Sequence, residues 1–368
     1  MPDQETVIGE YSYLPIERVH FGRGIISKLG AELDRIGSTR PFLITGHTIA
    51  EKTDLIARLE RASSRELVGV FSRIKQHAPM SGILAAAEEA NKSKADSLIS
   101  LGGGSPIDST KIIVRELSKN FQESPIPHIA VPTTLSASGF SHIAGMTDEK
   151  LNRKTGIRDV RLVPRLIFLD PELTVHTPSW LWASTGIRSL DHAVEAVYSP
   201  KHQPYVDTLA LEAIRVLFQK LKVSAGNPEN LQSRLCCQIA AWMSFGGVLS
   251  VGMGLSHAIG RVIGATWNIP HGITSCLTLA EVMRMEAKRS PERLALIAKA
   301  EGRPIDGLPA YKAALSAADG VSELVGELGL SKRLRDYGIK KEDFPMIVQE
   351  VADARQRAEV LQILEKIF

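Results

Sequence analysis

The stretch Leu101-Gly102-Gly103-Gly104-Ser105-Pro106-Ile107-Asp108 decides the expected fold of this chain. It follows a short apolar run, 97–101, and opens a segment, 106–117, whose apolar residues recur with the period of a helix. Glycines let backbone N–H groups approach an anion without interference from a Cβ atom. Ser105 is expected to cap the helix and Pro106 to fit its first turn, so the helix N-terminus would attract phosphate. The order of strand, glycines, cap and helix predicts a phosphate-binding loop rather than a plain glycine-rich turn.

Short apolar runs alternate with helix-period segments through the first half of the chain, which predicts a parallel sheet covered by helices. The expected strands are 41–45, 67–71, 97–101, 127–131 and 166–169, and the expected helices are 49–62, 82–93 and 106–117. After about residue 177 amphipathic segments follow at 181–197, 205–221, 231–251, 256–265, 291–300, 308–328 and 341–368. We therefore predict an N-terminal Rossmann-like α/β nucleotide-binding domain, 1–177, followed by a C-terminal all-α domain, 178–368.

The composition excludes several other classes of protein. The chain has 368 residues, which suits two domains, and 44 Lys and Arg against 41 Asp and Glu give a net charge of only +3. This balance gives no reason to expect a nucleic-acid or membrane partner. The three cysteines, Cys236, Cys237 and Cys276, form no CxxC motif and are expected to be reduced. The chain begins without a signal-peptide pattern, and no apolar run approaches the ~18–20 residues that span a bilayer, so we expect a cytoplasmic protein.

A second polar loop follows a predicted strand at 131–139. Its hydroxyl residues are Thr133, Thr134, Ser136 and Ser138. Hydroxyl groups at this density are able to hydrogen-bond phosphate and ribose oxygens, although they are also typical of an exposed loop. Both interpretations of this loop stay open.

Several motifs resemble those of one enzyme superfamily, the iron-containing (group III) alcohol dehydrogenases. Residues 102–111, GGGSPIDSTK, are similar to its GGGSxxDxxK signature, and Pro132-Thr133-Thr134 resembles its second cofactor loop. Residues 186–196, GIRSLDHAVEA, are similar to its GxDAxxHAxEA helix, and 254–261 with Pro270-His271-Gly272 resembles its histidine-rich stretch and PHG signature. Phe21-Gly22-Arg23-Gly24 also fits, and the motifs run in family order. Gln76-His77-Ala78-Pro79 is similar to the HxP element of the maleylacetate reductase branch.

The resemblance implies a dehydroquinate-synthase-like fold in which an α/β nucleotide-binding domain and a helical domain enclose an active-site cleft. It also implies hydride transfer with NADH or NADPH, and a homodimer. For a maleylacetate reductase-like member, the small-molecule substrate is expected to be an oxo or unsaturated carboxylic acid. The positions that the resemblance assigns to cofactor binding are Gly46, Gly102, Gly103, Gly104, Ser105, Asp108, Thr133, Thr134, Ser138 and Lys154.

The end of the first predicted strand bears on the choice between NADH and NADPH. Gly46 stands where many family members have an Asp, the kind of carboxylate that binds the ribose 2′-hydroxyl of NAD. Because no negative charge at Gly46 repels a 2′-phosphate, and because His47 or Lys52 is able to attract one, we expect both cofactors to work.

The positions that hold a metal in the family are altered in this chain. The resemblance implies that metal-dependent members use one Asp and three His to hold Fe or Zn. His192, His257 and His271 match the histidines, but Arg188 stands at the Asp position. A guanidinium ~4 Å from a divalent ion repels it by roughly 8 kcal/mol at an effective dielectric constant of ~20. Asp191 lies about 100° round the helix from His192 and is expected to point elsewhere. We therefore expect no essential metal; if one binds, its ligands would be the three histidines.

Two arginines replace an acid and a base in the expected active site. Arg188 stands at the Asp position, and Arg261 stands where the family has a second histidine with an implied role in proton relay or nicotinamide contact. They are expected either to pair with a local acid such as Glu195 or to bind a substrate carboxylate. The proton for the reduction is expected from His257 or His271. The catalytic candidates are His77, Arg188, His192, His257, Arg261 and His271.

Three classes of function stay open on the sequence alone. The first is a metal-independent reductase of an oxo-acid, and the second is a metal-dependent alcohol dehydrogenase with a reorganised site. The third is a cofactor-binding relative without net redox turnover, either a lyase similar to dehydroquinate synthase or a regulator. The loss of the Asp ligand favours the first class.

Overall fold

The chain of the computed structural model divides into two compact units, with the division between Thr177 and Pro178. The structure describes residues 10–149, 153–351 and 356–368. The α/β unit comprises residues 13–177 and 228–239, and the helical unit comprises 10–12, 178–227 and 240–368. The sequence pattern did not predict that the short segments 10–12 and 228–239 group in this way. The roles assigned to domains 1–177 and 178–368 stay predictions.

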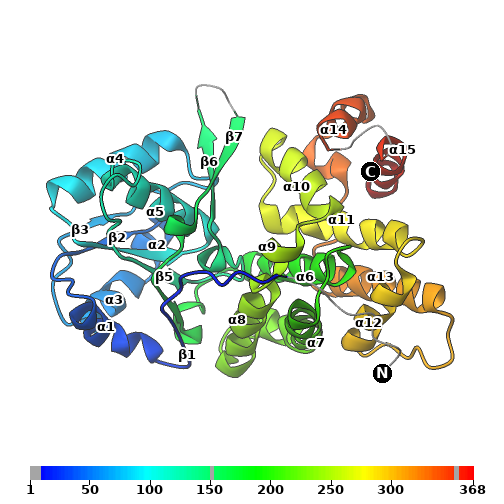
Figure 1. Ribbon diagram of the computed structural model, residues 1–368, viewed down its shortest axis with the longest axis horizontal. Helices are drawn as coiled ribbons and strands as arrows, with labels where there is room; N and C mark the ends of the chain where they lie inside the picture. Colours follow the sequence, from blue (N-terminus) through cyan, green and yellow to red (C-terminus); the bar gives the residue numbers. More distant parts are fainter. Residues whose placement is uncertain (1–9, 150–152, 352–355) are drawn as a thin grey trace. The chain divides into compact units, whose positions relative to one another are not determined.

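A parallel sheet of six strands forms the framework of the α/β unit (Figure 1). The strands lie in the order β1-β8-β5-β4-β2-β3. Their bounds are β1 Arg18–Phe21, β2 Pro41–Ile44, β3 Gly69–Phe71, β4 Ser97–Gly102, β5 His128–Pro132 and β8 Leu166–Leu169. A separate antiparallel hairpin consists of β6 Ile143–Asp148 and β7 Arg153–Arg158. The predicted parallel sheet is confirmed, while β1 and the hairpin were missed.

Helices cover both faces of the sheet because successive strand residues point to opposite sides. In β2, Phe42 and Ile44 pack with apolar residues of α4 and α5, whereas Leu43 packs with those of α1 and α3. The helices of this unit are α1 Leu29–Arg35, α2 His47–Lys52, α3 Leu55–Ser63, α4 Met80–Lys92 and α5 Gly104–Leu117. This arrangement buries the strands on both sides, which explains why they read as continuous apolar runs in the sequence.

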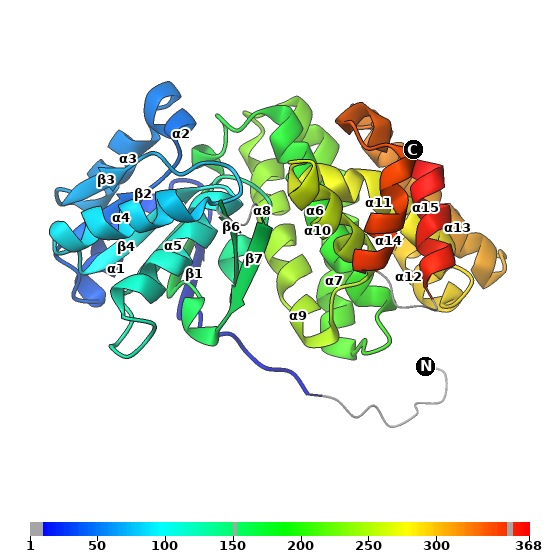
Figure 2. The same cartoon turned by 90° about the horizontal axis from the view of Figure 1, so that it is seen from above.

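The second half of the chain is helical, as predicted (Figure 2). Its helices are α6 Ser179–Tyr198, α7 Pro204–Gly226, α8 Leu231–Phe245, α9 Val248–Val251, α10 Leu255–Thr266, α11 His271–Glu286, α12 Pro291–Glu301, α13 Ala310–Glu327, α14 Phe344–Val351 and α15 Arg357–Ile367. Helix α6 packs against α7, α10 and α11, so neighbouring helices surround the segment that resembles the family's metal-binding helix.

Three predicted helices differ from the structure for local reasons. The predicted helix 49–62 is split into α2 and α3 because Thr53 has extended backbone angles. The predicted helix 231–251 ends at Phe245, and Gly247 lies so close to α7 that a Cβ atom there would be 2.4 Å from Val206 Cγ2. The predicted helix 341–368 is divided into α14 and α15, separated in part by residues outside the described ranges.

The stretch 231–251 corrects one expectation about apolar runs. By length and composition it is apolar enough to cross a membrane, but such a stretch is also typical of a core helix in a soluble protein. Just over half of its most apolar window is buried within the protein. Arg234 in this stretch is fully buried and donates hydrogen bonds to Oγ1 and the carbonyl oxygen of Thr174, both at 2.6 Å. These features favour a core helix.

A buried carboxyl group in α12 makes the stability of the helical unit depend on pH. Neither oxygen of Glu301 has a hydrogen-bond partner among the described residues, and burial raises its pKa from 4.5 to about 9, with Arg303 opposing the shift. Because the pKa of Glu301 is higher in the folded than in the unfolded protein, its protonated carboxyl contributes to stability. This contribution is fully present below about pH 4.5 and is lost as the pH rises through about 9.

We therefore expect Glu301→Gln to raise the free energy of unfolding at pH 9 by about 1–3 kcal/mol and to change it little at pH 5. Urea unfolding at both pH values measures the difference, with Glu292→Gln, an exposed position on the same helix, as the control. An equal effect of Glu301→Gln at pH 5 and pH 9 would contradict the pKa shift.

Candidate functional sites in the two units

The glycine loop joins β4 to α5 as predicted, but its helix begins differently. Gly102 has a φ of +141°, and a Cβ atom there would lie 2.9 Å from Pro106 Cγ, so glycine is required at this position. Helix α5 begins at Gly104 with Gly103 as its N-cap, and no side chain caps it. The predicted cap by Ser105 is wrong, because Ser105 lies inside the helix and its Oγ accepts a hydrogen bond from the backbone N–H of His77 at 3.2 Å.

The second polar loop, residues 133–138, lies against the glycine loop. A Cβ atom on Gly103 would be 3.1 Å from Thr134 Cγ2, and one on Gly104 would be 3.5 Å from Ser136 Oγ. Thr134 Oγ1 and Ser136 Oγ are buried and make no hydrogen bond to the residues that the structure describes. Buried hydroxyl groups are normally satisfied, so the two orphaned groups beside a glycine-rich helix start fit the oxygen atoms of a bound diphosphate.

Asp108 and Lys111 hold the end of this polar loop from inside α5. Asp108 accepts hydrogen bonds from Ser138 Oγ and from the backbone N–H of Gly145, the latter at 3.2 Å. Lys111 is fully buried, and its Nζ donates to the carbonyl oxygens of Ser138 and Ile143 at 2.7 and 2.8 Å. Burial lowers the pKa of Lys111, with Asp108 opposing the shift. Asp108 was among the predicted cofactor residues, whereas Lys111 was not, although the GGGSxxDxxK pattern contains it.

The remaining cofactor candidates occupy separate parts of the α/β unit. Gly46 is the N-cap of α2, where a Cβ atom would lie 3.3 Å from the carbonyl oxygen of Ile74. His47 is exposed and pairs with Glu51 at 2.9 Å, so a carboxylate already faces the imidazole that was expected to attract a 2′-phosphate. Lys154 lies in β7 opposite Thr147, and its side chain is outside the described part of the structure.

His77 occupies a strained turn next to the glycine loop. His77 and Ala78 both have positive φ angles, +64° and +49°, which are uncommon for residues other than glycine. Hydrogen bonds fix the turn: the His77 N–H donates to Ser105, and Thr147 Oγ1 donates to the His77 carbonyl oxygen at 3.0 Å. The structure thus ties the HxP element to the glycine loop through its backbone.

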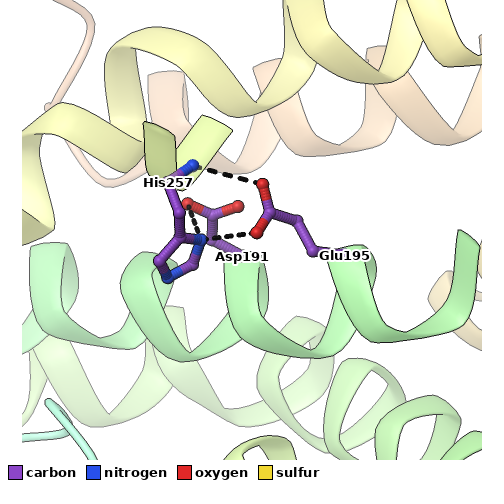
Figure 3. A group of neighbouring side chains, drawn as sticks. All are labelled: Asp191, Glu195 and His257. Atoms are coloured by element: carbon purple, nitrogen blue, oxygen red, sulfur yellow. Dashed lines mark hydrogen bonds and ion pairs between the residues drawn. The ribbon is translucent and has the colours of Figure 1, made fainter. Parts of the chain in front are cut away.

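In the helical unit, Asp191 and Glu195 of α6 lie beside His257 of α10 (Figure 3). Glu195 Oε2 is 2.6 Å from His257 Nδ1, and Asp191 Oδ2 is 3.6 Å from the same nitrogen. The backbone N–H groups of His257 and Gly254 donate to the two Glu195 oxygens at 3.2 and 2.6 Å. All three side chains are buried. His257 Nδ1 is therefore directed at carboxylates, while Nε2 is buried and makes no hydrogen bond to any described residue.

The position of Asp191 corrects the sequence prediction. Its Oδ2 atom accepts hydrogen bonds from Ser256 Oγ of α10 at 2.9 Å and Ser275 Oγ of α11 at 2.6 Å, and Arg188 Nη1 lies 3.6 Å away. The 100° step round the helix describes the direction of the Cα–Cβ bond, but it does not limit where a carboxylate reaches when hydroxyl groups from two other helices attract it. Asp191 therefore points into the cluster and is the local acid that faces Arg188, where Glu195 was named as an example.

Of the remaining catalytic candidates in the helical unit, His192 is buried, whereas His271 and Arg261 are exposed. His192 is buried, with its ring centroid 4.8 Å from that of His257. His271 is the first residue of α11 and is exposed. Arg261 of α10 is also exposed and forms no ion pair with a residue that the structure describes. The structure brings His192, His257 and Arg188 into one cluster and leaves His271 and Arg261 at the surface of the helical unit.

Burial determines the protonation of this cluster. It raises the pKa of Glu195 to about 7, although the N–H groups of Gly254 and His257 act in the opposite direction. Burial also lowers the pKa of His257 to about 3, and Arg188 adds to that shift. Burial also lowers the pKa of His192 well below its ordinary value of 6.5, so this ring is held neutral. The imidazoles are therefore uncharged at neutral pH, and the guanidinium of Arg188 is the cation of the cluster among the described groups.

These side chains do not fit the metal site that the resemblance implies. Among the described residues, the group of three whose ligand atoms lie within 4.8 Å of one another is Asp191, Glu195 and His257, so the three-histidine set is not assembled. In this group Nδ1 and Oε2 are only 2.6 Å apart, whereas two ligands at about 2.1 Å from a divalent ion are usually about 3 Å apart. Arg188 also faces Asp191 at 3.6 Å and repels a second cation.

Comparison with known proteins gives a consistent result over nearly the whole chain. Residues 16–171 match the iron-containing alcohol dehydrogenase family, and residues 182–366 match the C-terminal part of the Fe-containing alcohol dehydrogenase family. The chain is 30% identical over 327 residues to the maleylacetate reductase of Burkholderia cepacia, covering 89% of this chain and 86% of that protein. It is 28% identical over 353 residues to the lactaldehyde reductase of Escherichia coli (strain K12), covering 92% of each. The crystal structure of a 1,3-propanediol oxidoreductase has a TM-score of 0.91 at 26% identity and covers 98% of this chain and 100% of that one.

The matches of both units to alcohol dehydrogenases and reductases define the class of the chain, the nicotinamide-dependent oxidoreductases. The chain belongs to the iron-containing alcohol dehydrogenase family. The predicted superfamily and its maleylacetate reductase-like branch are confirmed, and so is the prediction of an NAD(P)H-dependent reductase.

Proposed function

We propose that this protein reduces a small oxo or unsaturated carboxylic acid with NADH or NADPH and needs no metal ion for the reaction. The observation that carries the proposal is Arg188, a guanidinium held beside Asp191 where the family's metal would need a carboxylate ligand. The similarity to maleylacetate reductases supports a carboxylic acid as the substrate. Reduced cysteines support a cytoplasmic enzyme, and the resemblance supports a homodimer.

The residues of the α/β unit are proposed to hold the cofactor. The N–H groups at the start of α5 bind the diphosphate, and the orphaned hydroxyls of Thr134 and Ser136 bind its oxygen atoms from the opposite loop. The bound nicotinamide supplies the hydride. Because Gly46 brings no carboxylate to the 2′ position, both NADH and NADPH are proposed to serve.

The helical unit is proposed to supply the proton and the substrate contact. His271 is exposed, so it is able to exchange protons with water and pass one to the substrate oxygen. His257 is buried and neutral, and it is proposed to orient the polar groups around it rather than to act as the acid. Arg261 is exposed and is proposed to receive the substrate carboxylate through its planar guanidinium.

A spectrophotometric assay tests the proposed function. Oxidation of NADH and NADPH is followed with a panel of oxo-acids and with aldehydes of matched length, in the presence and absence of EDTA, and the Fe and Zn content is measured. Turnover of an oxo-acid that survives EDTA is the expected result. Turnover of aldehydes alone, with activity lost in EDTA and one tightly held metal ion per chain, would replace the proposal by a metal-dependent alcohol dehydrogenase. Cofactor binding without turnover of any substrate would point to a non-redox relative.

Arg261→Ala is expected to distinguish an acid from its ester. Loss of a charge-assisted contact costs about 1.5–3 kcal/mol, so KM for the oxo-acid should rise about 10- to 150-fold while KM for its methyl ester changes little. Steady-state kinetics on both substrates gives the comparison, with Arg289→Ala as a control because Arg289 pairs with Glu286 at 2.9 Å on α11. Equal changes for the acid and the ester would remove Arg261 from the substrate site.

A further inference from the structure

The buried acid cluster of the helical unit requires a positive partner. Asp191 and Glu195 are 0% and 1% exposed, and an ionised carboxylate that is buried without a partner is strongly destabilising. The titratable groups that act on this cluster are Arg188, His192, Tyr198, His257, Cys276 and Glu286. Among these described groups, Arg188 carries a permanent positive charge, and its Nη1 lies 3.6 Å from Asp191 Oδ2.

The contact between Arg188 and the acids runs through a serine. Arg188 Nη1 donates to Ser275 Oγ at 3.0 Å, and Ser275 Oγ donates to Asp191 Oδ2 at 2.6 Å. The hydroxyl thus accepts from the cation and donates to the anion, which is the favourable direction at both ends. The direct distance from Nη1 to Asp191 Oδ2 is 3.6 Å. Ser275 lies on α11, whereas Arg188 and Asp191 lie on α6, so the contact joins two helices.

Helix α10 lies close to the guanidinium of Arg188. A Cβ atom on Gly260 of α10 would lie 3.8 Å from Arg188 Nη1 and only 2.7 Å from Thr274 Oγ1. The side chain of Arg188 is 15% exposed, so most of it is enclosed. The Arg188 guanidinium is therefore held against α10 and α11 rather than extended into solvent.

We propose that Arg188 is an internal cation that takes the place of a metal ion in this cluster. It offsets part of the negative charge of Asp191 and Glu195, and through Ser275 and Asp191 it holds the polar surroundings of His257. Arg188 is therefore a positioning residue, and it acts through Asp191. The inference rests on the proposed metal-independent function and names the group that makes that function possible.

The proposal has a direct consequence for metal binding. Replacing Arg188 with Asp removes one positive charge and adds one negative charge, a change of two units that equals the charge of a divalent ion. The new carboxylate would join Asp191 and the ring nitrogens His192 Nδ1 and His257 Nε2, which make no hydrogen bond to any described residue, while Glu195 stays on His257 Nδ1. Carboxylate and imidazole are ligand types that Zn²⁺ and Co²⁺ accept. The variant should therefore acquire a metal site that the natural sequence lacks.

Titration with Co²⁺ and Zn²⁺ tests this consequence without using enzyme activity. The full-length protein, Arg188→Asp, Arg188→Asn and the control Arg261→Asp are freed of metal with EDTA. They are then titrated while Co²⁺ absorption and the melting temperature are recorded. Arg188→Asp should bind one equivalent of Co²⁺ at least a hundredfold more tightly than the natural protein and should be stabilised against heat by Zn²⁺. Arg188→Asn offers a neutral oxygen ligand and should bind with intermediate affinity, while Arg261→Asp should behave like the natural protein.

Two results would overturn the proposal. One is tight binding of one equivalent of metal by the natural protein, because Arg188 would then not exclude the ion. The other is the absence of metal binding by both Arg188→Asp and Arg188→Asn. If Arg188→Asp folds only when Zn²⁺ is added, that result supports the proposal. If Arg188→Asp folds under no condition, metal binding by Arg188→Asn decides whether the proposal stands. A natural protein that reduces no oxo-acid would remove the proposed function and leave the metal titration interpretable.

Discussion

Gly103→Val should abolish binding of NADH and NADPH while leaving the protein folded. A Cβ atom at this position would lie 3.1 Å from Thr134 Cγ2 and 3.3 Å from Thr134 Oγ1, so the two methyl groups of valine would push the polar loop away from the glycine loop. The hydroxyl of Thr134 would thereby be displaced from the proposed diphosphate site.

Fluorescence titration with each nucleotide measures the effect of Gly103→Val, and circular dichroism with thermal unfolding checks the fold. Gly82→Val in α4 is the matched control, since a Cβ atom there meets nothing within 4 Å. The control should bind nucleotide like the natural protein. Unchanged nucleotide affinity in Gly103→Val, with the fold intact, would remove the glycine loop from the cofactor site.

The features that were predicted correctly depend on residues that are close together in the sequence. The parallel sheet follows from buried strands that read as apolar runs, and the glycine loop follows from a short motif. Helix α11 was missed because its buried face carries Thr274, Ser275 and Thr278, and hydroxyl residues do not produce an apolar period. Ser275 donates to Asp191 Oδ2 and Thr278 Oγ1 pairs with Ser256 Oγ of α10, contacts that depend on residues far away in the sequence.

The acid–histidine cluster shows why a site is harder to predict than a fold. The sequence identified His192, His257 and Arg188 from family positions, but their partners depend on how α6, α10 and α11 pack. Asp191 was assigned to another direction because only its angle round one helix was considered. Its carboxylate contacts Ser256 of α10 and Ser275 of α11, and the sequence of α6 alone does not indicate these contacts.

His271→Ala should lower kcat by about 10²- to 10⁴-fold, the usual contribution of a general acid, while nucleotide affinity stays unchanged. His271 is favoured over His257 because it is exposed at the start of α11, whereas burial and Arg188 keep His257 neutral with a pKa of about 3. Alanine is well tolerated in a helix, so the substitution should leave α11 intact.

Added imidazole provides the decisive measurement for His271, because a small acid from solution is able to enter the space left by an exposed side chain. It should restore part of kcat in His271→Ala and none in His257→Ala, where the missing ring belongs to a buried cluster. His202→Gln is the control, since His202 is exposed in the same unit and pairs with Asp207 at 3.5 Å. If His271→Ala keeps most of its turnover, the proton has another source; if imidazole restores His257→Ala instead, the cluster opens to solvent during turnover and His257 is the acid.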